Sequence, residues 1–326
     1  MGQNANTTET YDVSTIREDI QDILRDISPM DFVFMSNAKT RNVSNTFFET
    51  AERSLASAVS NNQVAEGEAS PANDAQSLPV RIGNYTEISD KVVEVSDTSQ
   101  KVSGVANAQT IAEGIATATK ELKRDMETSL FASKAGNAGS ANAGGARVTA
   151  GLPTWLRTNV SRATGGANPT LSGTTTGFPN AVATDAISGN MRAISQALLQ
   201  TVISSCWTNG ATPKILSVGP VQKQAVSGFA GNASKTREQA NTDGIIMAGM
   251  GIFISDFGEI SIIPSRFQRT RDAFVLDPEH MEVAYLSTLT QKPLARTGHS
   301  ERRLLSVEFG SYVYEKAHGV IADLNA

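Results

Sequence analysis

Few residues of this chain could perform chemistry, and they lie far apart in the sequence. Cys206 is the only cysteine, so the chain forms no internal disulfide and no cysteine-based metal cluster. The three histidines, His280, His299 and His318, are too widely spaced for a metal motif on one helix or loop. Cys206, His299 and Glu301 are the best candidates for catalysis, but they form no recognisable constellation. We therefore predict no catalytic residue, no metal site and no cofactor, and we expect Cys206 to be a core thiol.

Two glycine-containing stretches could suggest nucleotide binding. Four glycines between 136 and 145 lie in a Gly/Asn/Ala/Thr-rich segment, 134–180, which lacks the Lys-Ser/Thr pair of a phosphate-binding loop. The run 249–251 is followed by Ile254 where a dinucleotide-binding fingerprint needs a third glycine. Neither stretch predicts a nucleotide site.

The composition excludes further classes of function. The 326 residues carry 28 Lys+Arg against 33 Asp+Glu, a net charge of −5, which argues against a protein whose whole surface binds nucleic acid. The N-terminus lacks a signal-peptide pattern, and the longest near-apolar run, 244–254, is far shorter than the ~20 residues of a membrane span. We expect no contact with a membrane.

The charge is unevenly distributed along the chain. Residues 1–100 have a net charge of −9, whereas residues 134–237 contain nine Lys/Arg and a single acid, Asp185. Uneven solvation alone could explain this. Alternatively, the acidic front contacts the basic segment of a neighbouring copy, or the basic segment faces enclosed nucleic acid.

The first element that the sequence predicts is a short amphipathic helix over residues 15–28. Thr15 and Glu18 form a capping box, and Pro29 ends the helix. Its apolar residues recur at helical spacing: Ile16, Ile20, Ile23 and Ile27. A helix of this length is marginal alone in water, so we expect a docking arm rather than a free tail.

Residues 40–105 differ in character from the rest of the chain. Strand-like pieces at 43–49, 80–82 and 92–95 flank a polar stretch, 61–79, that is rich in Asn, Ala, Ser and Glu. We predict a long two-stranded projection with a flexible end, the alternative being a disordered insertion. Because a lone hairpin is at best marginally stable, a projection of this length needs a partner surface.

The remaining elements predict an α+β fold. Apolar spacing indicates a long helix over 106–131 and a second one that Thr184 caps and that ends before Gly210. A strand over 214–218 precedes a short helix with Pro220 in its first turn and with Val221, Ala225 and Phe229 facing inward. Strands follow at 260–263, 273–276, 281–285 and 304–314.

One basic cluster near the C-terminal strands could contact phosphate. It consists of Arg266, Arg269 and Arg271. Surface salt bridges with nearby acids such as Asp272 are the alternative, and we favour it.

Four stretches, in order along nearly the whole chain, resemble the major capsid proteins of tailed bacteriophages with the HK97-like fold. The similarity is closest to the SU10-type branch. The stretches lie within 16–34, 81–98, 121–127 and 294–321, and include the run Arg81-Ile82-Gly83-Asn84-Tyr85 and the run Leu294-Ala295-Arg296-Thr297-Gly298. The family's Glu-Trp-Gln motif is replaced here by Glu49-Thr50-Ala51, so its aromatic anchor is missing.

The resemblance implies a role for each segment. Residues 1–39 would form the N-terminal arm, and 40–105 the extended loop that overlaps a neighbouring subunit. Residues 106–183 and 256–326 would form the peripheral domain, with 106–131 as its spine helix. Residues 184–255 would form the α/β axial domain.

The implied function is that of a major capsid protein, which self-assembles as pentamers and hexamers into an icosahedral shell around double-stranded DNA. Further expected partners are the portal protein, a decoration protein, a separate scaffold protein or none, and packaged DNA through weak non-specific contact. Assembly would occur in the bacterial host cytoplasm. We predict DNA-facing charge at Arg266, Arg269 and Arg271. The predicted intersubunit contacts are Ile16, Ile20, Ile23, Ile27, Glu49, Glu66, Glu68, Arg81, Glu87, Arg124, Arg157 and Arg162.

Two other classes remain open at this point. A filament or surface-layer subunit would suit the Asn/Thr/Ala-rich composition, although flagellin-like chains place helical heptads at both ends and this C-terminus is β-rich. The enzyme class is weaker still, and a hydrolase or transferase activity abolished by His299→Ala would revive it.

Overall fold

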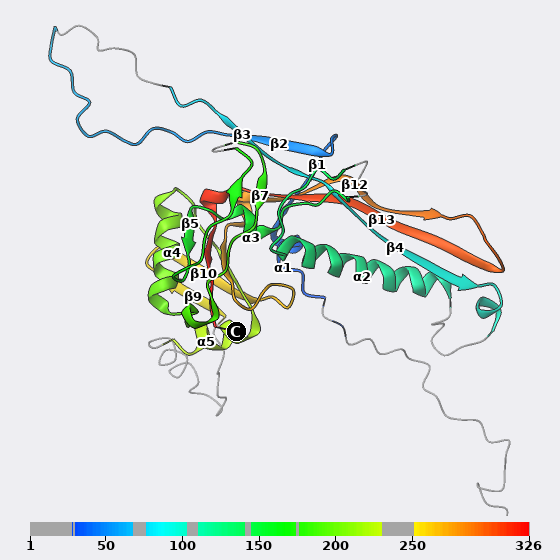
Figure 1. Ribbon diagram of the computed structural model, residues 1–326. Coiled ribbons are helices and arrows are strands. Elements are labelled where there is room, and N and C mark those ends of the chain that lie inside the picture. The colour runs from blue at the N-terminus through cyan, green and yellow to red at the C-terminus, as the bar shows by residue number, and fades with distance from the viewer. Residues whose placement is uncertain are drawn as a thin grey trace, which may run out of the picture.

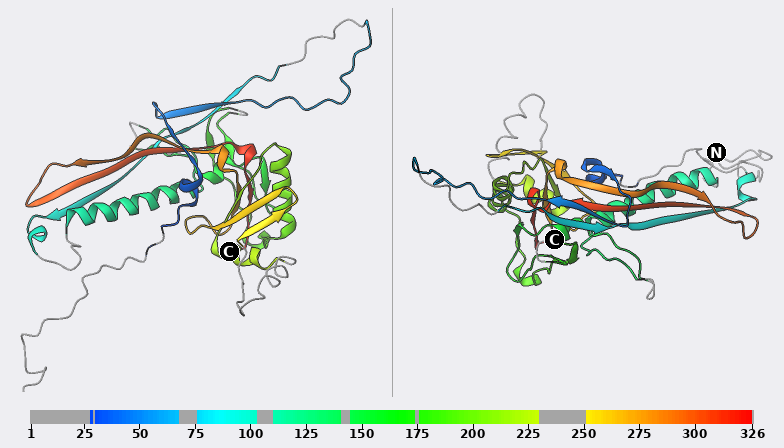
Figure 2. Two further views of the ribbon diagram at one scale, coloured as in Figure 1. Left: turned by 180° about the vertical axis from the view of Figure 1, so that it is seen from behind. Right: turned by 90° about the horizontal axis from the view of Figure 1, so that it is seen from above.

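The computed structural model describes residues 28, 30–67, 76–102, 110–140, 145–173, 176–229 and 251–325. The predicted arm helix, 15–28, lies outside these residues except at its last position. Helices and sheets are both present, so the α+β prediction is confirmed. A four-stranded sheet extends to one side of a compact body, and a hairpin leaves the opposite side (Figure 1, Figure 2).

The long sheet has the strand order β1-β12-β13-β4. Its strands are β1 (Lys39–Asn42), β12 (Met281–Pro293), β13 (Ser300–Val313) and β4 (Glu87–Ser96). β13 pairs antiparallel with both neighbours, and β1 joins β12 in parallel. Leu305, Val307 and Phe309 alternate along β13 and are all buried, so they form the inward face of this strand.

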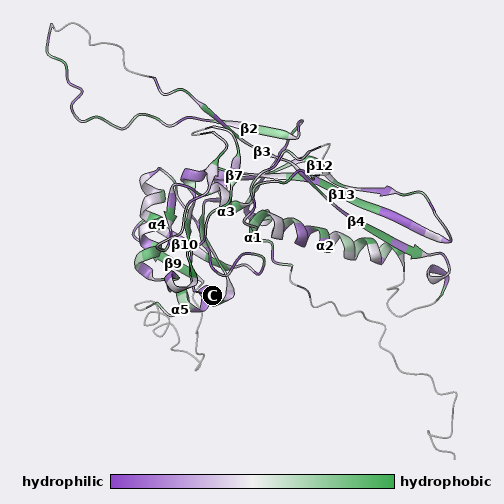
Figure 3. Ribbon diagram, in the orientation of Figure 1, coloured by the Kyte–Doolittle hydropathy of each residue, from purple (hydrophilic) through white to green (hydrophobic). Residues whose placement is uncertain are grey.

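Helix α2 (Ile111–Phe131) lies along one face of this sheet (Figure 1). Its buried residues Leu122, Met126 and Leu130 repeat every four positions, and hydrophobic and hydrophilic residues alternate along it in Figure 3. The predicted start at 106 is wrong. The helix begins after Thr110, because the Thr110 hydroxyl accepts a hydrogen bond from the Glu113 N–H and so caps the first turn.

The body is built on a six-stranded sheet of order β5-β14-β11-β8-β10-β9. Its strands are β5 (Asn159–Ser161), β14 (Gly319–Ile321), β11 (Ala273–Leu276), β8 (Ile215–Val218), β10 (Gly258–Pro264) and β9 (Ile252–Ser255). Helix α4 (Gln196–Thr208) packs on β14 and β5, and α5 (Pro220–Ser227) packs on β10. The sheet therefore combines strands from both sides of the predicted boundaries at 183/184 and 255/256.

The second long helix is shorter than predicted. It begins at Gln196, where the Ser195 hydroxyl accepts from the Leu198 N–H, and not after Thr184. Upstream, Thr184 pairs through its backbone with Ala167, and Ile187 is 72% exposed. The apolar spacing does continue backward from the helix. However, backbone hydrogen bonds to other segments hold 184–192 in an irregular path that includes the single turn η3 (Ser188–Asn190).

Helix α5 begins at Pro220 as predicted, but its inward face is different. Val221 and Ala225 are exposed, whereas Gln222 and Val226 are buried. The Gln222 amide donates to the carbonyls of Thr270 and Asn325, which rotates the buried stripe by one position. Phe229, just past the helix, is buried as expected.

The hairpin that leaves the body pairs β2 (Phe47–Glu52) with β3 (Val80–Tyr85). β4, which the sequence grouped with this projection, instead forms an edge of the four-stranded sheet. The remaining elements are short. They are α1 (Val33–Asn37), α3 (Leu152–Trp155), β6 (Thr170–Leu171), β7 (Pro179–Ala181), η1 (Ser99–Lys101), η4 (Pro278–His280) and η5 (Glu315–Ala317).

Candidate functional site

The catalytic candidates from the sequence do not come together. Cys206 is buried in α4, and burial raises the pKa of its thiol to about 12. His299 lies in the turn of the β12–β13 hairpin at the far end of the molecule (Figure 1), with its side chain 74% exposed. Glu301 is paired with Arg303. A buried, protonated thiol with no base beside it is a core residue.

The buried histidine also has a structural role. His318 Nδ1 accepts the Asp277 N–H at 3.0 Å, and Nε2 lies 3.1 Å from the His280 carbonyl oxygen. Burial lowers the pKa of His318 to about 4, so the ring is neutral near neutral pH and Nε2 carries its proton. It joins the end of β11 to the start of β14. Within the described part of the chain, no three His, Cys, Asp or Glu residues gather as metal ligands would.

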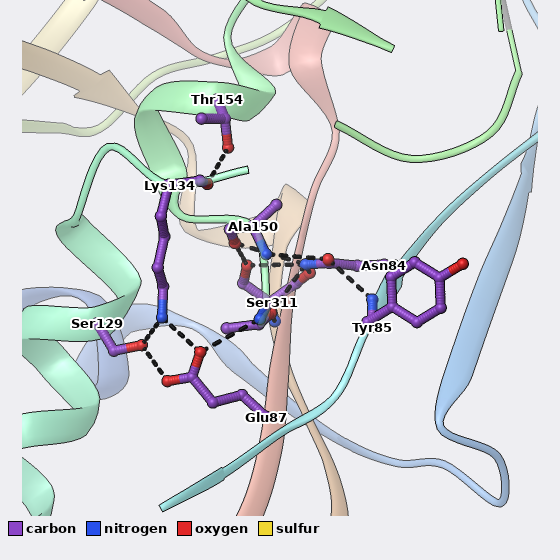
Figure 4. Close-up of polar contacts among 9 residues, drawn as sticks. Asn84, Tyr85, Glu87, Ser129, Lys134, Ala150, Thr154 and Ser311 are labelled. Carbon is purple, nitrogen blue, oxygen red and sulfur yellow. Dashed lines mark hydrogen bonds and ion pairs between the residues drawn. The ribbon is translucent and has the colours of Figure 1, made fainter. Parts of the chain in front are cut away.

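The root of the projecting hairpin is held by a buried amide, that of Asn84 (Figure 4). Its Nδ2 donates to Thr149 Oγ1 at 2.9 Å and to the Ser311 carbonyl at 2.8 Å. Its Oδ1 accepts from the N–H groups of Ala150 at 3.0 Å and Tyr85 at 2.9 Å. One fully buried side chain thus connects β3, the 145–151 segment and β13. Sequence reasoning missed Asn84, whose only signal was its place in the run 81–85.

A second cluster fixes the turn from β3 into β4 to the end of α2 (Figure 4). The Glu87 carboxylate accepts from Ser129 Oγ at 2.7 Å and from the Thr149 N–H at 3.2 Å, and it pairs with Lys134. The side chain of Glu87 is largely buried. The structure therefore shows this predicted contact residue bound within its own chain.

Outside the Asn84 contacts, side-chain interactions hold the paired strands of the hairpin, and the loop that joins these strands is exposed to solvent. Glu49 and Arg81 pair across β2 and β3, and the Tyr312 hydroxyl of β13 donates to Glu52. Burial raises the pKa of both Tyr312 and Glu52. Further out, Leu55 is 82% and Leu78 77% exposed. These two side chains therefore contribute little apolar burial to the isolated chain.

The short helix α1 has its own buried anchor. Glu127 of α2 is fully buried, and its carboxylate accepts from the N–H groups of Phe34 at 2.7 Å and Met35 at 3.1 Å. These are unpaired donors in the first turn of α1, so Glu127 caps that helix from a distant element. Phe32 stacks on Phe267, with 6.1 Å between the ring centroids. Sequence reasoning missed Glu127.

Comparison with known proteins identifies the family. A family model described as SU10 major capsid protein matches residues 3–325. The chain belongs to the SU10 major capsid protein family.

Further similarities agree with this capsid family. The chain is 34% identical over 110 residues to the major capsid protein of Escherichia phage Phieco32, a match that spans 33% of this chain and 31% of that relative. Among solved structures, the capsid of cyanophage A-1(L) superposes with a TM-score of 0.65 at 12% identity, covering 98% of this chain and 99% of the other. The SrpI encapsulin of Synechococcus elongatus gives a TM-score of 0.55 at 11% identity over 95% and 92% of the chains. The HK97-like fold is confirmed.

The basic segment 134–237 is partly neutralised within its own chain. Of its nine cations, Lys235 and Arg237 lie outside the described residues. Four others pair with carboxylates of the same chain: Lys134 with Glu87, Arg147 with Glu308, Arg157 with Glu315 and Lys214 with Glu279. The positive charge that this segment can offer to a neighbouring copy or to DNA is therefore smaller than a count of charged residues in the sequence indicates.

The arginines predicted to face DNA differ from one another. Arg269 donates hydrogen bonds to both carboxylate oxygens of Asp185, at 3.1 and 2.8 Å, and to Asp272 at 2.9 Å. Arg269 therefore forms salt bridges, as in the alternative to phosphate contact. The pKa of the Asp185 carboxyl is lowered, chiefly by its hydrogen bond from Arg269. Arg266 is exposed near Asp31, 4.0 Å away. Arg271 is partly exposed, and its carbonyl accepts from the Leu324 N–H.

The other predicted contact residues are scattered over the molecule. Arg124 is partly exposed on α2, and Glu66 is exposed on the loop of the projecting hairpin. Arg162 donates to Asn168, and burial lowers its pKa. Outside the described residues lie Ile16, Ile20, Ile23, Ile27 and Glu68. No described helix is both long enough and apolar enough to cross a bilayer.

Proposed function

We propose that many copies of this chain close, as pentamers and hexamers, into an icosahedral shell around packaged double-stranded DNA. The observation that carries this proposal is the β2–β3 hairpin. Its root is fixed by the buried amide of Asn84, while Leu55 and Leu78 further out are exposed to solvent. A projection with a fixed base and exposed leucines further out is suited to lie on a neighbouring subunit, where burial of these side chains would stabilise it.

The arrangement of domains forms part of the proposal. The four-stranded sheet with α2 acts as the peripheral domain, and the six-stranded sheet with α4 and α5 acts as the axial domain. Residues 1–39 act as an arm. With the hairpin outside these two layers, the interface per subunit should exceed the ~1,600 Å² of a standard complex.

Electron microscopy of the expressed chain tests the shell directly. We expect closed particles of uniform size when the protein is produced in a bacterial host, alone or with a separately encoded scaffold. Monomers or small rings under both conditions would contradict the proposal. Open filaments or flat lattices would instead favour a filament or surface-layer subunit.

Other partners follow from the same proposal. The portal protein would occupy one vertex, a decoration protein would bind the outer surface, and DNA would make weak, non-specific contact from inside. For DNA, the exposed Arg266 is the better candidate, because Arg269 is already neutralised by Asp185 and Asp272. Exchange of Arg266 for Gln should leave empty particles unchanged and alter only DNA-filled ones, measured as the salt concentration at which they release DNA.

A further inference from the structure

Helix α2 does not cover the whole inner face of the four-stranded sheet. Four strands at a spacing of about 4.8 Å make a face wider than one helix, whose diameter with side chains is about 10 Å. Helix α2 lies over β4 and β13. The part of this face that β12 provides lies beside α2 rather than beneath it.

An apolar groove runs along this uncovered strip. Its volume is about 160 Å³, and it is lined chiefly by Met35, Leu122, Met126, Tyr285, Leu289 and Val307. Leu289 is 41% exposed in it. Water gains little in an apolar space of this size, so filling it with apolar side chains is favourable.

We propose that residues 15–28 of the same chain, folded as an amphipathic helix, lie in this groove beside α2. The predicted stripe of Ile16, Ile20, Ile23 and Ile27 supplies the apolar face that the groove lacks. The root of the arm also starts at the right place. Met35 of α1 is itself a wall of the groove, and Glu127 fixes α1 to α2.

The length of the connection favours the chain's own arm over that of a second copy. The four residues 29–32, of which Phe32 is held by stacking on Phe267, separate the predicted helix from α1, and four residues span at most about 14 Å. Along α2 the groove extends from Thr119 to Met126, which corresponds to roughly 10 Å of helix. A helix tethered this closely has a high effective concentration at the groove.

Charge also favours one orientation of the helix. Asp19, Asp22 and Asp26 follow one another at intervals of three and four residues, so they form an acidic flank next to the isoleucine stripe. Lys123 of α2 lies on the rim of the groove. Turning the acidic flank toward α2 brings opposite charges together while the isoleucines face the sheet.

Engineered disulfides test this placement in the full-length, unassembled protein. Leu289→Cys is combined in turn with Cys at Ile16, Ile20, Ile23 or Ile27. The control pairs combine it with Glu18→Cys or Arg25→Cys on the opposite helix face. Cys206 should not interfere, since its thiol is buried with a pKa of about 12. We expect at least one stripe pair to lose both engineered free thiols to an intrachain bond on mild oxidation, while the control pairs keep theirs.

Other outcomes of this experiment would overturn the proposal. Covalent dimers on non-reducing gels would place the arm of a second copy in the groove. Equal crosslinking of stripe and control faces, or none, would show that the helix does not dock there.

Limited proteolysis provides a second readout that needs no disulfide geometry. Leu289→Asp should speed tryptic cleavage at Arg17 and Arg25, because a charge in the groove releases the arm. Val92→Asp is the matched control, at a half-exposed position on the opposite face of the sheet. Equal cleavage rates in the two variants would contradict docking. The proposal does not depend on shell formation, so microscopy of particles can succeed or fail independently.

Discussion

At the scale of single residues, two buried polar side chains join segments that are far apart in the sequence. Asn84 uses its amide as both donor and acceptor at the root of the hairpin, and Glu127 accepts two backbone N–H groups of α1. Both are fully buried. Buried polar groups must be paired, so each of these side chains fits a single local arrangement and specifies it.

The Asn84 amide should be essential for a stable subunit. Asn84→Ala leaves the Ala150 N–H and the Ser311 carbonyl with fewer partners, and each buried group left unsatisfied costs about 1–3 kcal/mol. We expect the free energy of unfolding, measured in urea, to fall by that order or more. Asn180→Ala, at an exposed position, is the control and should change it little.

The Glu127 carboxyl should make stability depend on pH in a defined direction. Burial raises its pKa above the ordinary 4.5, so the folded state holds the proton more tightly than the unfolded state. The contribution to stability is therefore fully present below pH about 4.5 and is lost as the pH rises through the folded pKa. Each unit of difference between the folded and the unfolded pKa changes the free energy of unfolding by about 1.4 kcal/mol. The difference between wild type and Glu127→Gln in urea unfolding at several pH values isolates this contribution, and an opposite slope would contradict the assignment.

At the scale of elements, the hairpin depends on close approach of its two strands. A Cβ atom on Gly83 of β3 would lie 2.4 Å from the Phe48 carbonyl oxygen of β2, a backbone atom that cannot move without separating the strands. The absence of a side chain at this position is thus what permits the pairing from Phe47 to Glu52.

Gly83→Ala should weaken the hairpin specifically. We expect faster amide hydrogen exchange across β2 and β3 and a loss of about 1–3 kcal/mol in stability, typical of overpacking. Gly251→Ala is the control, because its Cβ would meet no atom within 4 Å. Unchanged exchange in β2 and β3 of the Gly83 variant would show that the strands can separate without cost.

At the scale of the whole molecule, folding and assembly should be separable. Leu55 and Leu78 are almost fully exposed in the subunit, so Leu55→Ser with Leu78→Ser should leave the free energy of unfolding unchanged. The same pair should sharply reduce the yield of closed particles counted by electron microscopy, because the apolar contact with a neighbour is lost. Asn61→Ser on the same loop is the control, and equal particle yields for the two proteins would contradict a role for the hairpin in assembly.

The sequence by itself determined the family, the α+β class, the C-terminal strands and the core position of Cys206. These features depend on the local spacing of apolar residues and on motifs that are continuous in the sequence. Only the tertiary structure decided where α4 begins, that β4 belongs to the long sheet, and that Lys134, Arg147 and Arg157 are neutralised by carboxylates of their own chain. The physical reason is the same in each case. Hydrogen bonds and ion pairs between residues far apart in the chain outweigh local preference, and a charge count along the sequence does not include them.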